Sequence, residues 1–237
     1  MAGSNIICAN SCWLNSCKKL TSGTCHKSPD EFCQKIFRLH ELFKDALLSD
    51  TQMMNSKMQL YVDADGTDTE PFKALLNIEQ NIETFVSEGH NLYLFSPYAG
   101  NGKTSWAIRL VGSYFDKVWH KYVSGKALFI NVPRFLLELK SSLSRQSDYI
   151  DHIKQNILSV DLVVWDDIGT KVGTEFELEN LLSYINSRID LGKSNIYTSN
   201  ICPDKLDDVL GGRLYSRIVS MSTQVGLYGS DKRGLRV

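Results

Sequence analysis

The sequence lacks three features that would narrow its class at once: an excess of charge, a long apolar run and a secretory leader. Its 237 residues include 26 Lys and Arg against 27 Asp and Glu, which leaves a net charge of −1. A protein that binds nucleic acid through a surface that is basic overall is therefore excluded, and any contact with nucleic acid must come from a local basic patch. No stretch approaches the roughly 18 apolar residues of a membrane helix, and no basic segment precedes an apolar core at the N-terminus. We expect a soluble cytoplasmic protein without a membrane partner.

The cysteines are concentrated near the N-terminus, which indicates a small module ahead of a full domain. Five of the six lie among the first 33 residues, namely Cys8, Cys12, Cys17, Cys25 and Cys33. The closely paired C-x2-C of a strong zinc site is absent. In a cytoplasmic chain, clustered thiols bind metal or stay reduced more often than they form disulfides, so these three states are open.

A helix is expected directly after the cysteines. Ser28-Pro29-Asp30-Glu31 has the form of a capping box with proline at the first helical position. Apolar residues then recur at helical spacing as far as Leu47. This helix would carry Cys33 on its first turns and would begin just after Cys25 and His26. Three metal donors would then converge, and small modules that lack a core commonly need a metal.

The rest of the chain has the pattern of an α/β domain. Residues 51–62 are predicted to be a connector, and residues 63–68 a plain acidic turn. From Thr69 onward short apolar runs alternate with helical patterns, which indicates a parallel sheet covered by helices on both faces. The expected strands are Leu92–Phe95, Ala127–Ile130, Leu162–Trp165, Asn195–Tyr197 and Gln224–Tyr228. The expected helices span 69–88, 103–116, 132–158 and 174–190, and the expected division is a Cys-rich helical module (1–55), a linker (56–69) and the α/β domain (70–237).

A glycine-rich loop joins the first expected strand to the next helix. Its glycines allow successive backbone N–H groups to point inward at phosphate, and the helix N-terminus adds its dipole. Lys103 would reach the β- and γ-phosphates, and the Thr104 hydroxyl would ligate Mg²⁺. Pro97 replaces the first glycine of the G-x-x-x-x-G-K-[ST] pattern, but the strand–loop–helix context favours a nucleotide site over a chance turn. The predicted nucleotide contacts are Ala99, Gly100, Asn101, Gly102, Lys103, Thr104 and Ser105.

Two adjacent carboxylates, Asp166 and Asp167, end a strongly apolar strand. In α/β folds ligands bind at the carboxyl ends of the strands. Asp166 therefore fits a Mg²⁺ ligand, and Asp167 fits a base for the attacking water. An acidic strand end could equally cap the next helix, but the phosphate-binding loop earlier in the chain favours the catalytic interpretation.

Two later elements complete the pattern. Asn200 ends a strand and is a polar group that could touch the γ-phosphate or its water, although ordinary turns begin in the same way. Arg213 and Arg217 lie four residues apart, on one face of a helix. Residues 213–237 hold five Arg or Lys against one acid, which favours an anionic partner over simple solvation.

In this order and spacing, the four elements resemble the AAA+ ATPases, specifically the helicase loaders of the DnaC/DnaI type, including versions carried by bacteriophages. The resemblance covers about residues 70–237 and implies a P-loop AAA+ sheet without a distinct lid domain. It implies a sensor 1 role for Asn200, a trans-acting arginine finger at Arg217 and a sensor 2 arginine at Arg233. The Walker A and Walker B motifs fall on Gly100–Thr104 and Leu162–Asp167.

The resemblance also implies partners. A loader of this type would be a Mg²⁺-dependent ATPase that self-associates through its ATP sites and recruits a hexameric, DnaB-type replicative helicase to single-stranded DNA. Thr174 and Phe176 would contact that DNA, although Phe176 would equally suit a core position. The N-terminal module would bind zinc and dock on the helicase. Its expected ligands are Cys12, Cys17, Cys25 and Cys33, with Cys8 and His26 as alternatives.

Two departures from the family pattern leave other functions open. Asp167 stands where most AAA+ proteins carry Glu, and Pro97 alters the start of the Walker A loop. A nonhydrolysing adaptor that uses nucleotide to hold its shape is therefore one alternative. A transposition-helper ATPase of the same branch, acting on duplex DNA, is another. A bacteriophage protein of any of these kinds would act in the host cytoplasm.

Overall fold

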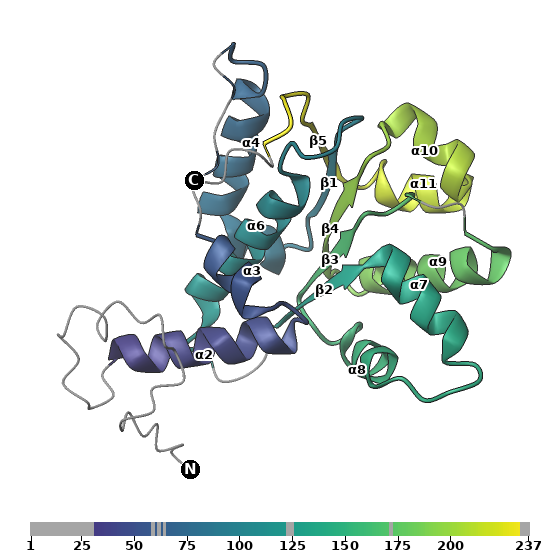
Figure 1. Ribbon diagram of the computed structural model, residues 1–237, viewed down its shortest axis with the longest axis horizontal. Coiled ribbons are helices and arrows are strands. Elements are labelled where there is room, and N and C mark those ends of the chain that lie inside the picture. Colours follow the sequence, from purple (N-terminus) through teal and green to yellow (C-terminus); the bar gives the residue numbers. More distant parts are fainter. Residues whose placement is uncertain are drawn as a thin grey trace.

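A five-stranded parallel sheet lies at the centre of the computed structural model, which describes residues 31–57, 60, 63, 65–121, 126–170 and 173–232 (Figure 1). The strands are β1 (Asn91–Phe95), β2 (Ala127–Asn131), β3 (Leu162–Asp166), β4 (Ser194–Ser199) and β5 (Thr223–Gly226). Their order across the sheet is β2-β3-β4-β1-β5, and each neighbouring pair is parallel. The carboxyl ends of β1, β3 and β4 therefore meet at one edge, although these strands are far apart in the chain.

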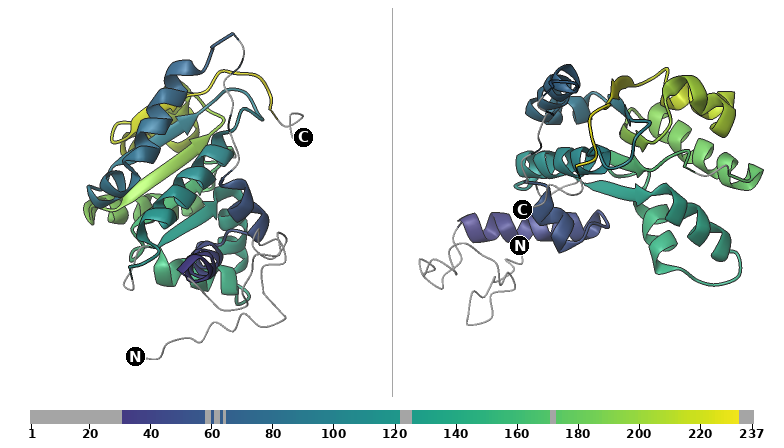
Figure 2. Two further views of the ribbon diagram at one scale, coloured as in Figure 1. Left: turned by 90° about the vertical axis from the view of Figure 1, so that its left-hand side faces the viewer. Right: turned by 45° about the horizontal axis from the view of Figure 1, so that its top comes forward.

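The described helices cover both faces of this sheet (Figures 1 and 2). One face packs against α2 (Glu31–Asp45), α3 (Asp50–Asn55), α4 (Thr69–Gln80), α5 (Ile82–Ser87) and α6 (Lys103–Val118). The other packs against α7 (Val132–Ser141), α8 (Asp148–Asn156), α9 (Glu175–Asp190), α10 (Pro203–Leu210) and α11 (Gly212–Ile218). Because strand side chains alternate, Leu92 and Leu94 join the first core and Tyr93 and Phe95 the second. The predicted parallel sheet with two covered faces is confirmed.

The segment predicted as one helix over 132–158 consists of two helices, α7 and α8, which this prediction missed. The chain leaves the helical path at a serine-rich stretch. Ser142 Oγ donates a hydrogen bond to Leu139 O at 2.7 Å, and Ser144 Oγ donates one to Ser141 O at 3.1 Å. Such local hydroxyl bonds compete with helix propagation, which explains the break.

Residues 51–55, which are expected in the connector, belong to α3. Ser49 caps this helix, since its hydroxyl accepts from Gln52 N at 3.3 Å while Gln52 Oε1 accepts from Ser49 N at 2.9 Å. This reciprocal capping box is visible as S-x-x-Q in the sequence. Met53 is buried in the same core as the sheet, so tertiary packing stabilises a helix of only six residues.

Helices α2 and α3 share a core with the sheet. Leu39 and Leu42 are buried in the cluster that covers one face of the strands, and the rings of Phe43 and Phe115 meet edge-on at 5.2 Å. Phe129 N in β2 donates to Ala46 O at 2.9 Å, so the turn after α2 covers the outer edge of the sheet. The described part of the predicted N-terminal module thus packs into the α/β core. Residues 1–30 lie outside the described residues.

No helix in the described ranges combines the length and apolar character that a membrane span requires.

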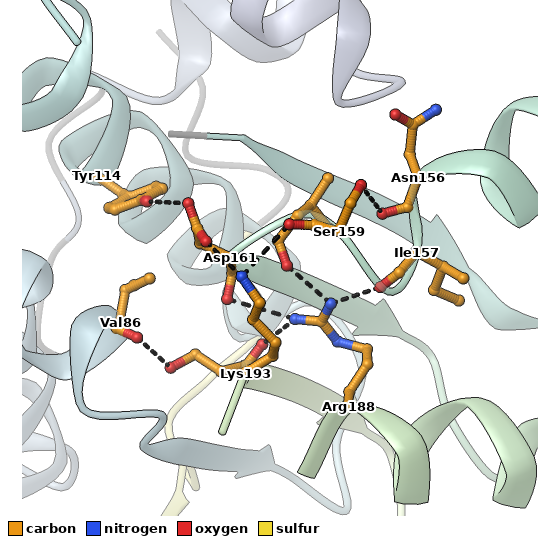
Figure 3. Close-up of polar contacts among 10 residues, drawn as sticks. Val86, Tyr114, Asn156, Ile157, Ser159, Asp161, Arg188 and Lys193 are labelled. Atoms are coloured by element: carbon orange, nitrogen blue, oxygen red, sulfur yellow. Dashed lines mark hydrogen bonds and ion pairs between the residues drawn. The ribbon is translucent and has the colours of Figure 1, made fainter. Parts of the chain in front are cut away.

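A buried arginine joins several elements at the amino ends of the strands (Figure 3). Arg188, on α9, is fully buried, and its Nε donates to Asn195 Oδ1 at 2.8 Å. Its guanidinium also donates to four backbone carbonyls, those of Ile157, Val160, Asp161 and Ser194. Burial lowers the pKa of Arg188 to about 10, so the group stays charged at neutral pH. Carbonyls just after α8 stabilise that charge, because the C-terminal end of a helix attracts cations.

Replacing Arg188 with Met should lower the free energy of unfolding by more than about 3 kcal/mol, because buried carbonyls would lose their donors at roughly 1–3 kcal/mol each. Urea denaturation followed by tryptophan fluorescence measures this change. Arg134→Met is the control, since Arg134 is exposed and lies over the Tyr149 ring at 4.2 Å. The Arg134→Met variant should lose less than about 1 kcal/mol of the free energy of unfolding. Equal losses in the two variants would contradict the role of Arg188.

Candidate functional site

The loop between β1 and α6 has the shape of a phosphate-binding site. Gly100 and Gly102 have φ values of 82° and 100°, which glycine adopts without strain. Gly102 is the N-cap of α6, so the loop leads directly into the N-terminus of a sixteen-residue helix. Free backbone N–H groups and the helix dipole attract anions at such an end. The predicted contact residues 99–105 all lie on this loop or the first turn of α6.

The start of the loop is held by side chains instead of the missing Walker glycine. Tyr98 N donates to Ser96 Oγ at 3.0 Å, and Asn101 Nδ2 also donates to Ser96 Oγ. Asn101 is buried, and it donates a second bond to Leu227 O at 2.9 Å. Pro97 is exposed outside this network, so its fixed φ does not disturb the glycine turn that follows.

Lys103 points into its own loop. The side chain is buried, with 6% of the residue exposed, and Nζ donates to Tyr98 O at 2.9 Å and to Asn101 Oδ1 at 3.3 Å. The ammonium group therefore sits among the acceptors of the loop, where phosphate oxygens could replace them as stronger, charged acceptors.

Three elements meet at the carboxylate of Asp166. Oδ1 accepts a hydrogen bond from Oγ1 of Thr104, which belongs to α6, at 2.9 Å. It accepts a second from Oγ1 of Thr198, which belongs to β4, at 2.7 Å. The two predicted Mg²⁺ ligands, Thr104 and Asp166, are thus brought into contact. A hydroxyl and a carboxylate are the hard oxygen donors that Mg²⁺ prefers, so these residues fit the ion.

Asp167 has an unusual backbone and environment. Its φ of 59° lies in the left-handed region, which Asp and Asn tolerate better than other side chains that carry a Cβ. Burial and the neighbouring Asp166 raise the pKa of Asp167, while Lys103 opposes that shift. A raised pKa increases the basicity of a carboxylate, which suits the predicted proton acceptor.

Comparisons with known proteins concern the sequence and the fold of the chain. No protein-family model matches the chain. The chromosomal replication initiator protein DnaA of Acinetobacter baylyi is 29% identical over 146 residues, or 62% of this chain and 30% of DnaA. The chain thus spans under a third of the length of that curated relative.

Solved structures match more of the chain. The structure of the DnaC helicase loader superposes with a TM-score of 0.60 at 20% identity, over 76% of this chain and 99% of the chain in that structure. The structure of DnaA bound to AMPPCP and single-stranded DNA superposes with a TM-score of 0.57 at 19% identity, over 72% of this chain and 49% of the chain in that structure. The chain has the AAA+ fold. The resemblance in fold to DnaC/DnaI-type loaders, expected from the motifs, is confirmed.

Of the two predicted sensor residues, Asn200 and Arg233, the structure describes only Asn200. Asn200, the predicted sensor 1, is exposed directly after β4, next to Ser199, whose carbonyl accepts from Ser96 N at 3.1 Å. It is therefore at the same edge as the Walker A loop. Arg233, the predicted sensor 2, lies outside the described residues. The roles of both stay predictions.

Arg217, the predicted arginine finger, is separated from the Walker A helix by the sheet. It lies on α11, on the face opposite α6 (Figure 1). With Arg213 it lines an open groove of about 750 Å³ against Glu179 and Ser183 of α9. This placement suits a contact with another molecule better than one with its own phosphate site.

Thr174 and Phe176, the predicted DNA contacts, lie at the start of α9. Thr174 is the N-cap and forms a capping box with Glu177, whose Oε2 accepts from Thr174 N at 2.7 Å. Phe176 is 42% exposed, so it is not a core residue. Its ring is available for stacking, while the Thr174 hydroxyl is engaged within the cap; the DNA contact stays a prediction.

The zinc prediction stays untested. Cys33 is half-buried on the first turn of α2, but Cys8, Cys12, Cys17, Cys25 and His26 lie outside the described residues. Among the residues that the structure describes, no group of three or more His, Cys, Asp or Glu is placed to hold a metal.

A contact that sequence reasoning missed lies over the Walker A loop. Asp68, fully buried, accepts from Tyr228 N at 2.7 Å and from Gly229 N at 2.9 Å. Three residues beyond Gly229, Lys232 N donates to Gly100 O at 2.9 Å. A Cβ on Gly100 would lie 1.9 Å from Asp231 Oδ1, so the exposed Asp231 side chain would have to move to admit another residue, while the positive φ favours glycine. The acidic turn 63–68 thus holds the segment 227–232 against the loop.

Asp167→Asn should raise the free energy of unfolding at neutral pH. The folded pKa of this carboxyl is raised, so its charged form destabilises the folded state above that pKa. The advantage of Asn should shrink as the pH falls through the folded pKa and vanish below the unfolded one. Chemical denaturation over a pH series measures it.

The control for this pH series is Asp208→Asn, which changes an exposed carboxylate on α10. It should alter the free energy of unfolding by no more than about 0.5 kcal/mol. A destabilised Asp167→Asn protein at neutral pH would contradict the assigned electrostatics.

Proposed function

We propose that this chain is an ATP-dependent helicase loader that recruits a hexameric, DnaB-type replicative helicase to single-stranded DNA during DNA replication. One observation carries the choice among replication proteins: the likeness extends over 99% of the chain in the DnaC structure and 94% of that in the DnaI structure, but over 49% of the chain in the structure of DnaA with AMPPCP and single-stranded DNA. The proposed site of action is the cytoplasm, or the host cytoplasm for a bacteriophage protein. The Walker A loop and the two carboxylates beside it support ATP as the ligand.

The arrangement supports hydrolysis through the following roles. Lys103 would bind the β- and γ-phosphates, and Thr104 and Asp166 would hold Mg²⁺, which neutralises charge on the phosphate oxygens. Asp167 would accept the proton of the attacking water. Asn200, at the same edge of the sheet, would orient the water or the γ-phosphate.

Self-association would complete the site. Arg217 lies on α11, on the opposite face of the sheet from α6, and lines a groove against α9. Head-to-tail contacts between subunits generate rings or open spirals. The guanidinium of Arg217 would then lie at the γ-phosphate of a neighbour, with Arg233 acting as sensor 2. The exposed Phe176 ring supports stacking on single-stranded DNA, with Thr174 beside it. The Cys-rich module at residues 1–55, with zinc bound, would dock on the helicase.

The function is tested by reconstitution of purified protein with a DnaB-type helicase and single-stranded DNA. The wild type should increase the helicase bound to that DNA in an ATP-dependent manner. Lys103→Ala should weaken ATP binding at least about tenfold, since a hydrogen bond to a charged group contributes roughly 1.5–3 kcal/mol. Asp167→Asn should bind ATP normally but turn it over about 10²–10⁴-fold more slowly.

The alternatives give different results in the same assay. Equally negligible turnover in the wild type and Asp167→Asn, with ATP bound by both, would favour the nonhydrolysing adaptor. Binding of duplex DNA in preference to single strands, without any helicase recruitment, would favour the transposition helper. Wild-type ATP affinity in Lys103→Ala would overturn the nucleotide site itself.

The trans role of Arg217 predicts complementation between two inactive variants. Arg217→Ala and Lys103→Ala should each lose ATPase activity, by about 10³–10⁵-fold for a missing arginine finger. Mixed assemblies should regain partial activity wherever an intact phosphate site meets an intact finger.

Subunit mixing followed by an ATPase assay measures this recovery. Lys205→Ala, on the exposed surface of α10, is the control and should retain full activity alone. Absence of recovery at every ratio, with mixed assembly verified by cross-linking, would exclude the trans arrangement.

A further inference from the structure

Thr198 contacts both Walker B carboxylate residues from the neighbouring strand. It lies near the carboxyl end of β4 and is fully buried. Its Oγ1 donates to Asp166 Oδ1 at 2.7 Å and accepts from Asp167 N at 3.0 Å. One hydroxyl therefore joins the predicted metal ligand to the backbone of the predicted base.

The bonding capacity of this hydroxyl is matched to its neighbours. A threonine hydroxyl has one hydrogen and two lone pairs. The hydrogen goes to the carboxylate of Asp166, and a lone pair receives the N–H of Asp167. The backbone of the same residue continues the restraint, since Thr198 O accepts from Ile168 N at 2.9 Å.

These contacts lie on both sides of Asp167, the residue of the site with a strained backbone. Asp167 has a φ of 59°, and its own N–H and that of Ile168 are both bound to Thr198. A side chain in this sparsely populated region persists where surrounding contacts hold it. Thr198 thus restrains the direction in which the Asp167 carboxylate leaves the strand.

We propose that Thr198 is a positioning residue of the ATPase site, which orients Asp166 for Mg²⁺ and holds Asp167 toward the water. The inference rests on the proposed ATPase function. Of the two hydroxyls on Asp166 Oδ1, Thr104 is the predicted metal ligand, so Thr198 is the one that acts on the carboxylate without touching the ion. Loss of such outer contacts lowers metal affinity or activity about 10–100-fold in metal sites generally.

The test compares Thr198→Val, which keeps the branched shape without the hydroxyl, with Thr198→Ser, which keeps the hydroxyl. Binding of a fluorescent ATP analogue is titrated with Mg²⁺, so the readout does not depend on turnover. Thr198→Val should raise the half-saturating Mg²⁺ concentration about 10–100-fold, with analogue binding in EDTA unchanged. Thr198→Ser should stay close to the wild type.

Ser194→Ala is the matched control for loss of a buried hydroxyl. Ser194 begins the same strand and donates to Phe85 O at 3.1 Å, at the opposite edge of the sheet. This variant should lose stability without any change in the Mg²⁺ midpoint. Thr198→Ala, which also lacks the hydroxyl, replaces Thr198→Val if circular dichroism shows that the valine variant does not fold.

The outcomes separate the two proposals. Suppose that the wild type binds nucleotide normally and that folded Thr198→Val or Thr198→Ala has the same half-saturating Mg²⁺ concentration. That result overturns the role of Thr198 alone. An equal shift in Ser194→Ala also overturns it, because the effect would then follow stability. A wild-type protein that binds no nucleotide at any Mg²⁺ concentration overturns the ATPase function, and the positioning role with it.

Discussion

The convergence of α6 and β4 on one oxygen of Asp166 is the constraint on which the candidate site depends. Thr104 reaches that oxygen from the helix after the Walker A loop, and Thr198 reaches it from the neighbouring strand. Each contact requires β1, β3 and β4 to end at the same edge, which the parallel order of the sheet supplies. A shift of β4 by one residue would turn Thr198 to the opposite face and separate the two carboxylate residues from their restraint.

The two edges of the sheet carry different interactions. At the amino ends, the buried Arg188 and the Lys193–Asp161 ion pair, 2.7 Å long, bind the strand starts to α8 and α9 (Figure 3). At the carboxyl ends, Asp167 has a left-handed backbone and a carboxylate whose charge is disfavoured by burial and by Asp166. Hydrogen bonds hold both ends of the strands, but of these two ends the one that would perform chemistry has the strained backbone and the disfavoured charge, as is common at functional sites.

The Walker A loop is held from outside as well as by its glycines. Asn101 and Gly100 bond to the segment 227–232, and Asp68 binds that segment to the turn before α4. The loop is therefore connected to the segment that follows β5 and, through Asp68, to the turn that precedes α4. The chain departs from the Walker pattern at Pro97 yet keeps an ordered loop, because Ser96 and Asn101 supply the contacts that fix its start.

Periodicity and motif order in the sequence determined the parallel sheet, its five strands within a residue or two, the Walker A loop and the pairing of Asp166 with Thr104. These follow from local patterns, since strand alternation and a glycine loop before a helix need no knowledge of distant contacts. Only the tertiary structure decided that Thr198 and Asp68 belong to the site and that Phe176 is exposed. The physical reason is that strand register and long-range hydrogen bonds join residues far apart in the chain, and no local spacing records them.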